Sequence, residues 1–300
     1  MPDKQQGLLN LIQKAHKLVE NTDLEKHRQS QDQFAALLST RKDMIYEDIL
    51  IDDIHAEWIR VNRPHDKKKV ILYCHGGGYS TGSSTYARAV TTKLAAATSL
   101  DVLCFDYRLA PEYPYPAQLE DAEKAWDYLM LLGYGAEDVI LAGDSAGGNL
   151  ALVLTYLLRE NKRMLPKALL LFSPWTDLTS SGKSHQNKEG VDPVLNAQYL
   201  EGMIENYLAQ KFMQIDLELL QNPLVSPLFA DFTGFPPTYI QVGDEEVLLS
   251  DAELLAKKMT KAKVSVKLDV FHGMWHVFQM SPLKKSGEAI DKCAEFIFDL

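Results

Sequence analysis

Cysteine is scarce in this sequence, and its placement excludes most thiol chemistry. The three cysteines, Cys74, Cys104 and Cys293, are never spaced as C-x-x-C, so neither a structural zinc site nor a redox pair is expected. Cys74 and Cys104 lie inside apolar runs that are typical of buried strands. We expect all three to be inert thiols of the core.

Long apolar runs and an excess of basic charge are also missing. The first twenty residues place apolar side chains at helical spacing with polar ones between them, which fits neither a secretory signal nor a membrane span. The formal net charge is -10 and the basic residues are scattered, so nucleic acid is not expected as a partner. We expect a cytoplasmic protein without stable membrane insertion, a monomer or a homodimer.

Short apolar segments alternate with stretches long enough for helices. Strand patterns cover 44–51, 54–61, 69–74, 101–106, 138–143, 167–173, 236–243 and 263–271. Helical patterns cover 5–20, 30–40, 84–98, 117–132, 147–160, 249–261 and 283–299. This alternation predicts an α/β fold with a mostly parallel central sheet and helices on both faces.

One insertion breaks this rhythm and divides the predicted chain. Residues 183–222 begin with a polar stretch and continue with an amphipathic run from Leu195 to Leu208. We expect this insertion and the N-terminal helices, residues 1–45, to form a helical cap. Residues 46–182 and 223–300 would then form the core.

The pattern G-x-S-x-G, which marks the nucleophile of many hydrolases, occurs twice. Ser145 comes directly after a predicted strand and before a long apolar helix, as the tight turn of a nucleophile elbow requires. Ser80 is separated from its strand by "CHGGGY", and its glycines suit a loop that exposes backbone N–H groups to a ligand. We therefore predict Ser145 as the nucleophile. Neither loop carries the G-K-[ST] ending of a phosphate-binding P-loop.

Three motifs together resemble those of one enzyme family. They are "HGGG" at 75–78, "DYRLAPEYPYPAQLEDA" at 106–122 and "GDSAGGN" at 143–149. In this combination and order the sequence is similar to the hormone-sensitive-lipase family of α/β-hydrolase carboxylesterases, from about Tyr46 onward. The resemblance implies an oxyanion hole made by the N–H groups of Gly77, Gly78 and Ala146, so that the first G-x-S-x-G overlaps the oxyanion loop.

The nucleophile needs a histidine base from a loop after the last strand. The segment "FHGMWHVF" offers His272 and His276. Members of the resembling family commonly read Gly-Met-x-His here, which implies His276 as the base and leaves His272 at the end of the strand.

The orienting acid is harder to choose because several carboxylates follow "YIQVG". The family usually shows Asp-Pro-Leu at this point, and matching that leucine to Leu248 implies Glu246 as the acid. This sequence departs from the pattern, although a glutamate can accept the histidine Nδ1–H as an aspartate does. The alternatives are Asp244, Glu245 and Asp251.

The resemblance implies hydrolysis of small esters with short or medium acyl chains, through an acyl-enzyme on Ser145. No cofactor or metal is expected, since no H-E-x-x-H or clustered Cys/His spacing is present. The same residues would also suit an amidase or a deacetylase of sugars or xenobiotics. A non-catalytic receptor, such as the plant gibberellin receptor that shares this fold, lacks the catalytic histidine, so His276 argues against that alternative.

Overall fold

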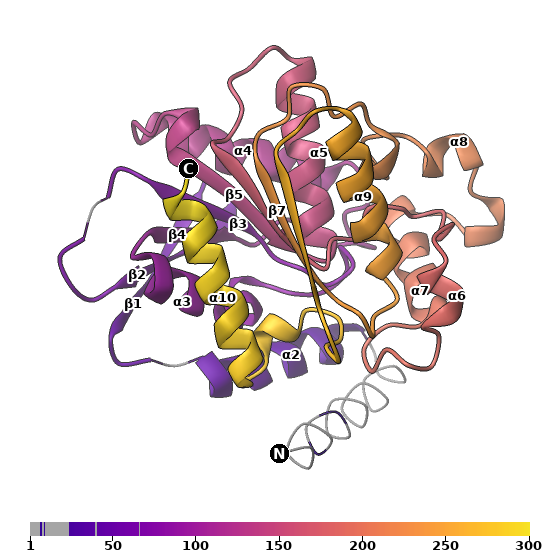
Figure 1. Cartoon of the computed structure of the whole chain (residues 1–300), viewed down its shortest axis with the longest axis horizontal. Helices are drawn as coiled ribbons and strands as arrows, with labels where there is room; N and C mark the ends of the chain where they lie inside the picture. The colour runs from indigo at the N-terminus through magenta and orange to yellow at the C-terminus, as the bar shows by residue number, and fades with distance from the viewer. Residues whose placement is uncertain (1–6, 8, 10–23, 40, 66) are drawn as a thin grey trace.

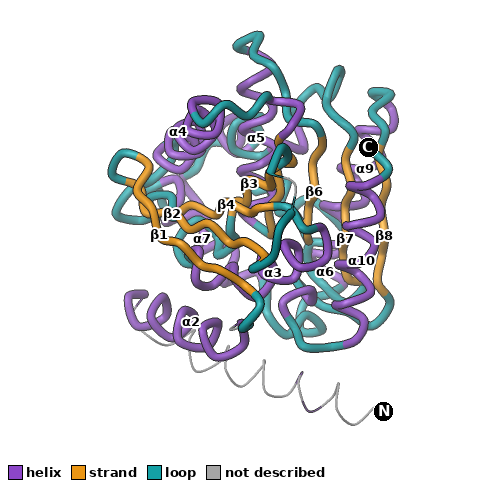
Figure 2. The backbone as a smooth tube through the Cα atoms, turned by 90° about the vertical axis from the view of Figure 1, so that its left-hand side faces the viewer, coloured by secondary structure: helices purple, strands orange, loops and turns teal. Residues whose placement is uncertain are grey.

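A single eight-stranded sheet organises the protein in the computed structural model, which describes residues 7, 9, 24–39, 41–65 and 67–300 (Figure 1). Its strands are β1 (Met44–Ile51), β2 (Ile54–Val61), β3 (Val70–Cys74), β4 (Asp101–Phe105), β5 (Val139–Asp144), β6 (Ala168–Phe172), β7 (Thr238–Gly243) and β8 (Val266–Phe271). They lie in the order β1-β2-β4-β3-β5-β6-β7-β8 (Figure 2). Only β2 runs antiparallel to its neighbours, β1 and β4; the six strands from β4 to β8 in this order pair in parallel.

Helices cover both faces of the sheet, as the alternating pattern predicts. Along β3, Val70 and Leu72 pack on one face, and Ile71 and Tyr73 on the other, because successive side chains of a strand point in opposite directions. The first face is covered by α4 (Ala117–Leu131), α5 (Ala146–Glu160) and α9 (Leu249–Lys261), and the second by α3 (Ser84–Thr98) and α10 (Lys284–Phe298). The chain therefore has an α/β-hydrolase architecture, and the carboxyl ends of its parallel strands meet at one edge.

The strand and helix bounds agree with the sequence prediction to within three residues, apart from the N-terminal region. There α2 spans Leu24–Ser39, six residues earlier than the predicted start at residue 30. Its first turns lack an apolar stripe and are held by polar contacts, such as those from Arg28 to the Ser80 carbonyl and to Glu112. The predicted helix at 5–20 lies outside the described residues, apart from residues 7 and 9.

The insertion at 183–222 folds into short helices on one side of the molecule (Figure 1). They are α6 (Ser184–Asn187), α7 (Ala197–Leu208) and α8 (Leu217–Leu220). Helix α7 buries an apolar face, of which Leu200 and Met203 line a cavity with Ser145, and its Tyr207 ring stacks on Tyr79 with centroids 4.1 Å apart. Four 3₁₀ turns complete the described structure, at Ala136–Asp138, Phe212–Gln214, Pro227–Phe229 and Phe278–Met280.

All three cysteines are buried with free thiols, and burial raises their pKa values. Within the described ranges no helix is both long and apolar enough to cross a bilayer.

Candidate active site

Ser145 occupies the turn between β5 and α5, where the backbone is strained. Its φ of 53° and ψ of -120° are rare for a residue with a side chain. Gly143 and Gly147 make the turn possible, because a Cβ on Gly143 would lie 2.4 Å from the Gly147 carbonyl oxygen, and one on Gly147 would lie 2.0 Å from the Cys74 carbonyl oxygen. The small residues of this motif thus allow the strand to reverse directly into the helix.

His276 lies against this serine. It follows β8, is buried, and places its Nε2 atom 3.0 Å from the Ser145 hydroxyl. Its Nδ1 atom is 2.9 Å from Oε2 of Glu246. If Nδ1–H donates to the carboxylate, Nε2 is left free to accept the serine proton.

Glu246 is fully buried and its other oxygen is also engaged. Oε1 accepts hydrogen bonds from the Ser173 hydroxyl at 2.9 Å and from the Gly243 N–H at 2.5 Å. The hydroxyl of Ser173 in turn accepts the Val277 N–H at 3.1 Å, next to the histidine. Ser173, which the sequence reasoning missed, therefore connects the loops that carry Glu246 and His276.

The alternative acids and base lie elsewhere. Asp244 pairs with His272 at 2.7 Å and accepts the Gly273 N–H, and the His272 side chain is 93% exposed. Asp251 is buried but accepts two backbone N–H groups and bonds His185. Glu245 is exposed. Among the predicted acids, the structure brings only Glu246 to His276.

The electrostatic surroundings of His276 favour its protonated form. Burial lowers the pKa of His276, but the hydrogen bond and charge of Glu246, with the charges of Asp192 and Asp144, raise it above the ordinary 6.5. A base with such a pKa takes the serine proton readily once the imidazole is neutral.

This shift gives a pH prediction. If His276 is the base, only its neutral form can accept the serine proton. On that hypothesis kcat/KM should fall as the pH drops through the pKa of His276, and the midpoint should lie above pH 6.5. Initial rates on p-nitrophenyl acetate across the neutral range measure it. A midpoint well below the ordinary histidine value would contradict the electrostatic picture.

The "HGGG" loop passes beside Ser145. Gly77 has a φ of +114°, and a Cβ there would lie 2.2 Å from the Thr81 carbonyl oxygen. Asp144 accepts the Gly76 N–H at 3.0 Å and so fixes the loop beside Ser145. Within the described chain the N–H groups of Gly77, Gly78 and Ala146 donate to no acceptor, which suits groups kept for a substrate oxygen.

Ser80 has a structural place in this loop. It is fully buried, its N–H donates to the Gly77 carbonyl, and its hydroxyl has no partner among the described residues. Among the described residues no histidine is hydrogen-bonded to its hydroxyl, as His276 is to that of Ser145.

A small cavity of about 50 Å³ opens at the site. It is enclosed by glycines of the loop, by Ser145 and His276, and by apolar side chains of the insertion and of the loop after β6. The apolar members are Trp175, Val194, Leu195, Leu200 and Met203. Among the described residues no group of three or more His, Cys, Asp or Glu side chains is placed to hold a metal ion.

Comparison with known proteins shows the family to which the chain belongs. Residues 71–280 match the family described as the alpha/beta hydrolase fold. The chain is 36% identical to an esterase of Acinetobacter venetianus over 77% of this chain and 75% of the esterase, and 39% identical to an acetyl-hydrolase of Streptomyces hygroscopicus over 74% and 72%. A crystal structure of an esterase from the bacterial hormone-sensitive lipase family superposes with a TM-score of 0.88 at 33% identity, covering 96% of each chain.

The protein is thus an α/β-hydrolase. It belongs to the hormone-sensitive-lipase family of carboxylesterases, and it is a carboxylic ester hydrolase of the serine esterase type.

Proposed function

We propose that Ser145, His276 and Glu246 are the catalytic triad of this esterase. The observation that carries the proposal is the continuous contact from the Ser145 hydroxyl through His276 to the buried Glu246. Nε2 takes the serine proton while Oγ attacks the ester carbonyl carbon, and the proton then passes to the departing alcohol. Water, deprotonated by the same nitrogen, attacks the acyl-enzyme and releases the carboxylic acid and the free serine.

The oxyanion of each tetrahedral intermediate would be held by the N–H groups of Gly77, Gly78 and Ala146. Their lack of acceptors supports this role. The first turn of α5 adds its partial positive charge at the same point. Such preorganised donors act on charge that develops only in the transition state.

The proposed substrates are small esters with short acyl chains, extending to medium ones. A cavity of about 50 Å³ accommodates roughly three or four water-sized groups, as an acetyl to butyryl chain requires. One of the relatives is named an acetyl-hydrolase, which is consistent with this size. We assign the insertion at 183–222 and the N-terminal region, residues 1–45, to a cap. The insertion contributes apolar side chains to this cavity, and the N-terminal region contributes Gln31.

A panel of p-nitrophenyl esters tests this size limit. We expect kcat/KM to be highest between acetate and butyrate and to fall for octanoate. Leu200→Ala should shift the preference toward longer chains, because Leu200 lines the cavity.

Leu208→Ala is the matched control, since Leu208 is a buried leucine of the same helix outside the cavity lining. Each truncation removes about 2–5 kcal/mol of stability, so only a difference in chain-length profile is informative. If both variants kept the parent profile, or the parent preferred octanoate, the cavity would not set the acyl preference.

The same triad could act on amides or acetylated sugars, and parallel assays of an anilide and an acetylated sugar test these substrates.

We further propose a cytoplasmic enzyme that works as a monomer or homodimer. The net charge of -10 opposes binding to nucleic acid.

A further inference from the structure

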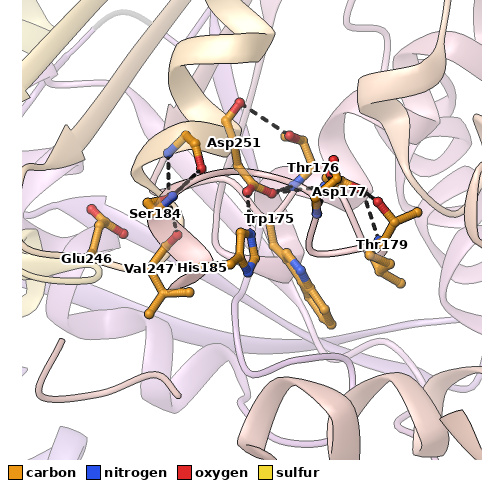
Figure 3. Close-up of polar contacts among 12 residues, drawn as sticks. Trp175, Thr176, Asp177, Thr179, Ser184, His185, Glu246, Val247 and Asp251 are labelled. Atoms are coloured by element: carbon orange, nitrogen blue, oxygen red, sulfur yellow. Dashed lines mark hydrogen bonds and ion pairs between the residues drawn. The ribbon is translucent and has the colours of Figure 1, made fainter. Parts of the chain in front are cut away.

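Both backbone polar groups of Val247, the residue after Glu246, are bound by side chains of the insertion at 183–222. The Val247 N–H donates to Oδ2 of Asp192 at 2.9 Å. The hydroxyl of Ser184 donates to the Val247 carbonyl, and Figure 3 shows Ser184 beside Val247 with Glu246 next to it. Hydrogen bonds from the insertion, and not only contacts within the core, therefore hold the backbone next to Glu246 in place.

The second oxygen of Asp192 holds two residues of the cavity wall in place. Oδ1 accepts the N–H groups of Val194 at 2.9 Å and Leu195 at 3.1 Å, and both of these residues line the cavity. Asp192 is only 8% exposed, and its two oxygens bond three backbone N–H groups. One carboxylate thus joins the acid loop to the cavity wall.

The region around this carboxylate is firmly held. Oδ2 of Asp251 accepts the N–H groups of Thr176 and Asp177, both at 2.9 Å, and Oδ1 bonds Nε2 of His185 at 2.8 Å (Figure 3). The His185 contact fastens the start of the insertion to the first turn of α9, and the two N–H contacts fasten the loop after β6 to the same turn. Asp192 therefore acts between two fixed elements rather than on a free loop.

We propose that Asp192 is a positioning residue for ester hydrolysis, which holds Glu246 in register with His276 through Val247 and shapes the acyl cavity through Val194 and Leu195. The proposal rests on the triad proposed above. Asp192 is not among the residues that line the cavity with Ser145, so it acts through its neighbours.

The negative charge of Asp192 also raises the pKa of His276. The carboxylates that face His276 come from three elements: Glu246 from the acid loop, Asp192 from the insertion and Asp144 from the end of β5. Burial raises the pKa of Asp192 to about 6 against the opposing charge of His276. Three backbone N–H groups donate to its oxygens and stabilise the ionised form. Removing this negative charge should lower the pKa of His276.

Asp192→Asn tests the proposal. An amide has a single acceptor oxygen, so either the Val247 N–H or the Val194 and Leu195 pair would face an NH₂ group. We expect kcat on p-nitrophenyl acetate to fall about 10- to 100-fold, as for a small displacement of reacting groups. The acid limb, which is the fall of kcat/KM as the pH drops, should also move to lower pH.

Asp216→Asn is the matched control, because Asp216 is an exposed aspartate of the same insertion that caps α8 through the Glu218 N–H. It should keep both the rate and the pH profile of the parent. An Asp192→Asn enzyme with kcat within twofold of this control, or with a lower kcat but an unmoved acid limb, would overturn the proposal.

Ser184→Ala keeps the proposal testable if Asp192→Asn does not fold. It removes the uncharged hydrogen bond to the Val247 carbonyl, so kcat should fall about two- to tenfold. The pH at which kcat/KM falls on the acid side should not change. Ser184 and Asp192 hold the two polar groups of the same residue, so an unchanged kcat would show that contacts from the insertion to Val247 do not position Glu246, and it would overturn the proposal. Glu246→Gln is assayed alongside: if it stays active, the triad itself is wrong, whereas an inactive Glu246→Gln beside a control-like Asp192→Asn refutes only the role of Asp192.

Discussion

Replacement of Ser145 by alanine should abolish ester hydrolysis, with kcat falling by roughly four to six orders of magnitude. The reason is that Oγ of Ser145 is the only proposed atom that becomes covalently bonded to the acyl group. The oxyanion N–H groups and the cavity would remain, and they account for whatever rate survives. The fold should be retained, since His276 is the only side chain hydrogen-bonded to the removed hydroxyl within the described structure.

Ser80→Ala is the natural control for this loss, because Ser80 carries the other G-x-S-x-G pattern. Its buried hydroxyl has no partner within the described structure, so its removal should leave most of the activity. The measurement is kcat on p-nitrophenyl acetate together with the melting temperature of each variant. A folded Ser80→Ala enzyme without activity, beside an active Ser145→Ala enzyme, would reverse the assignment of the nucleophile.

Glu246→Gln should lower kcat by about 10³- to 10⁴-fold at neutral pH. In the parent, Oε2 bonds His276 while Oε1 accepts from Ser173 and Gly243. A glutamine must turn its NH₂ group toward one side. Toward His276 it stabilises the tautomer that cannot accept the serine proton, and toward Gly243 it opposes another donor.

Asp244→Asn is the matched comparison, since Asp244 is the neighbouring carboxylate paired with a histidine, the exposed His272. Its loss should cost less than about tenfold in kcat/KM, a change of under about 1.4 kcal/mol. Both variants are assayed on one acetate ester with melting curves recorded in parallel. A large loss confined to Asp244→Asn would show that the acid is two residues earlier than proposed.

The strands and the strand-to-helix turn at Ser145 were predictable because their signals are local. Apolar runs fix the sheet, and small residues on both sides of Ser145 satisfy the steric demands of a strand-to-helix turn. The choice between Asp244 and Glu246 was not settled by local pattern, since each lies in the same loop. Only the tertiary structure shows that one is buried against His276 and the other faces His272.

Ser173 and Asp192 were missed for a different reason. Ser173 carries a weak signal, its position directly after β6 at the carboxyl end of a parallel strand, where functional side chains gather. Asp192 lies in an insertion without sheet periodicity, and its partner Val247 is 55 residues away in sequence. Contacts of this range depend on how the insertion folds back, which the amphipathic pattern of its helix does not specify.

The most direct test of the whole account is the site of covalent modification. The enzyme is labelled with a fluorophosphonate, which reacts only with an activated serine, and the adduct is located by mass spectrometry of peptides. We expect a single adduct, on Ser145. It should be absent from Ser145→Ala, and its formation should be much slower in Glu246→Gln. An adduct on Ser80, or no adduct on a folded enzyme that still hydrolyses acetate esters, would contradict the assignment of Ser145, His276 and Glu246 as the catalytic machinery.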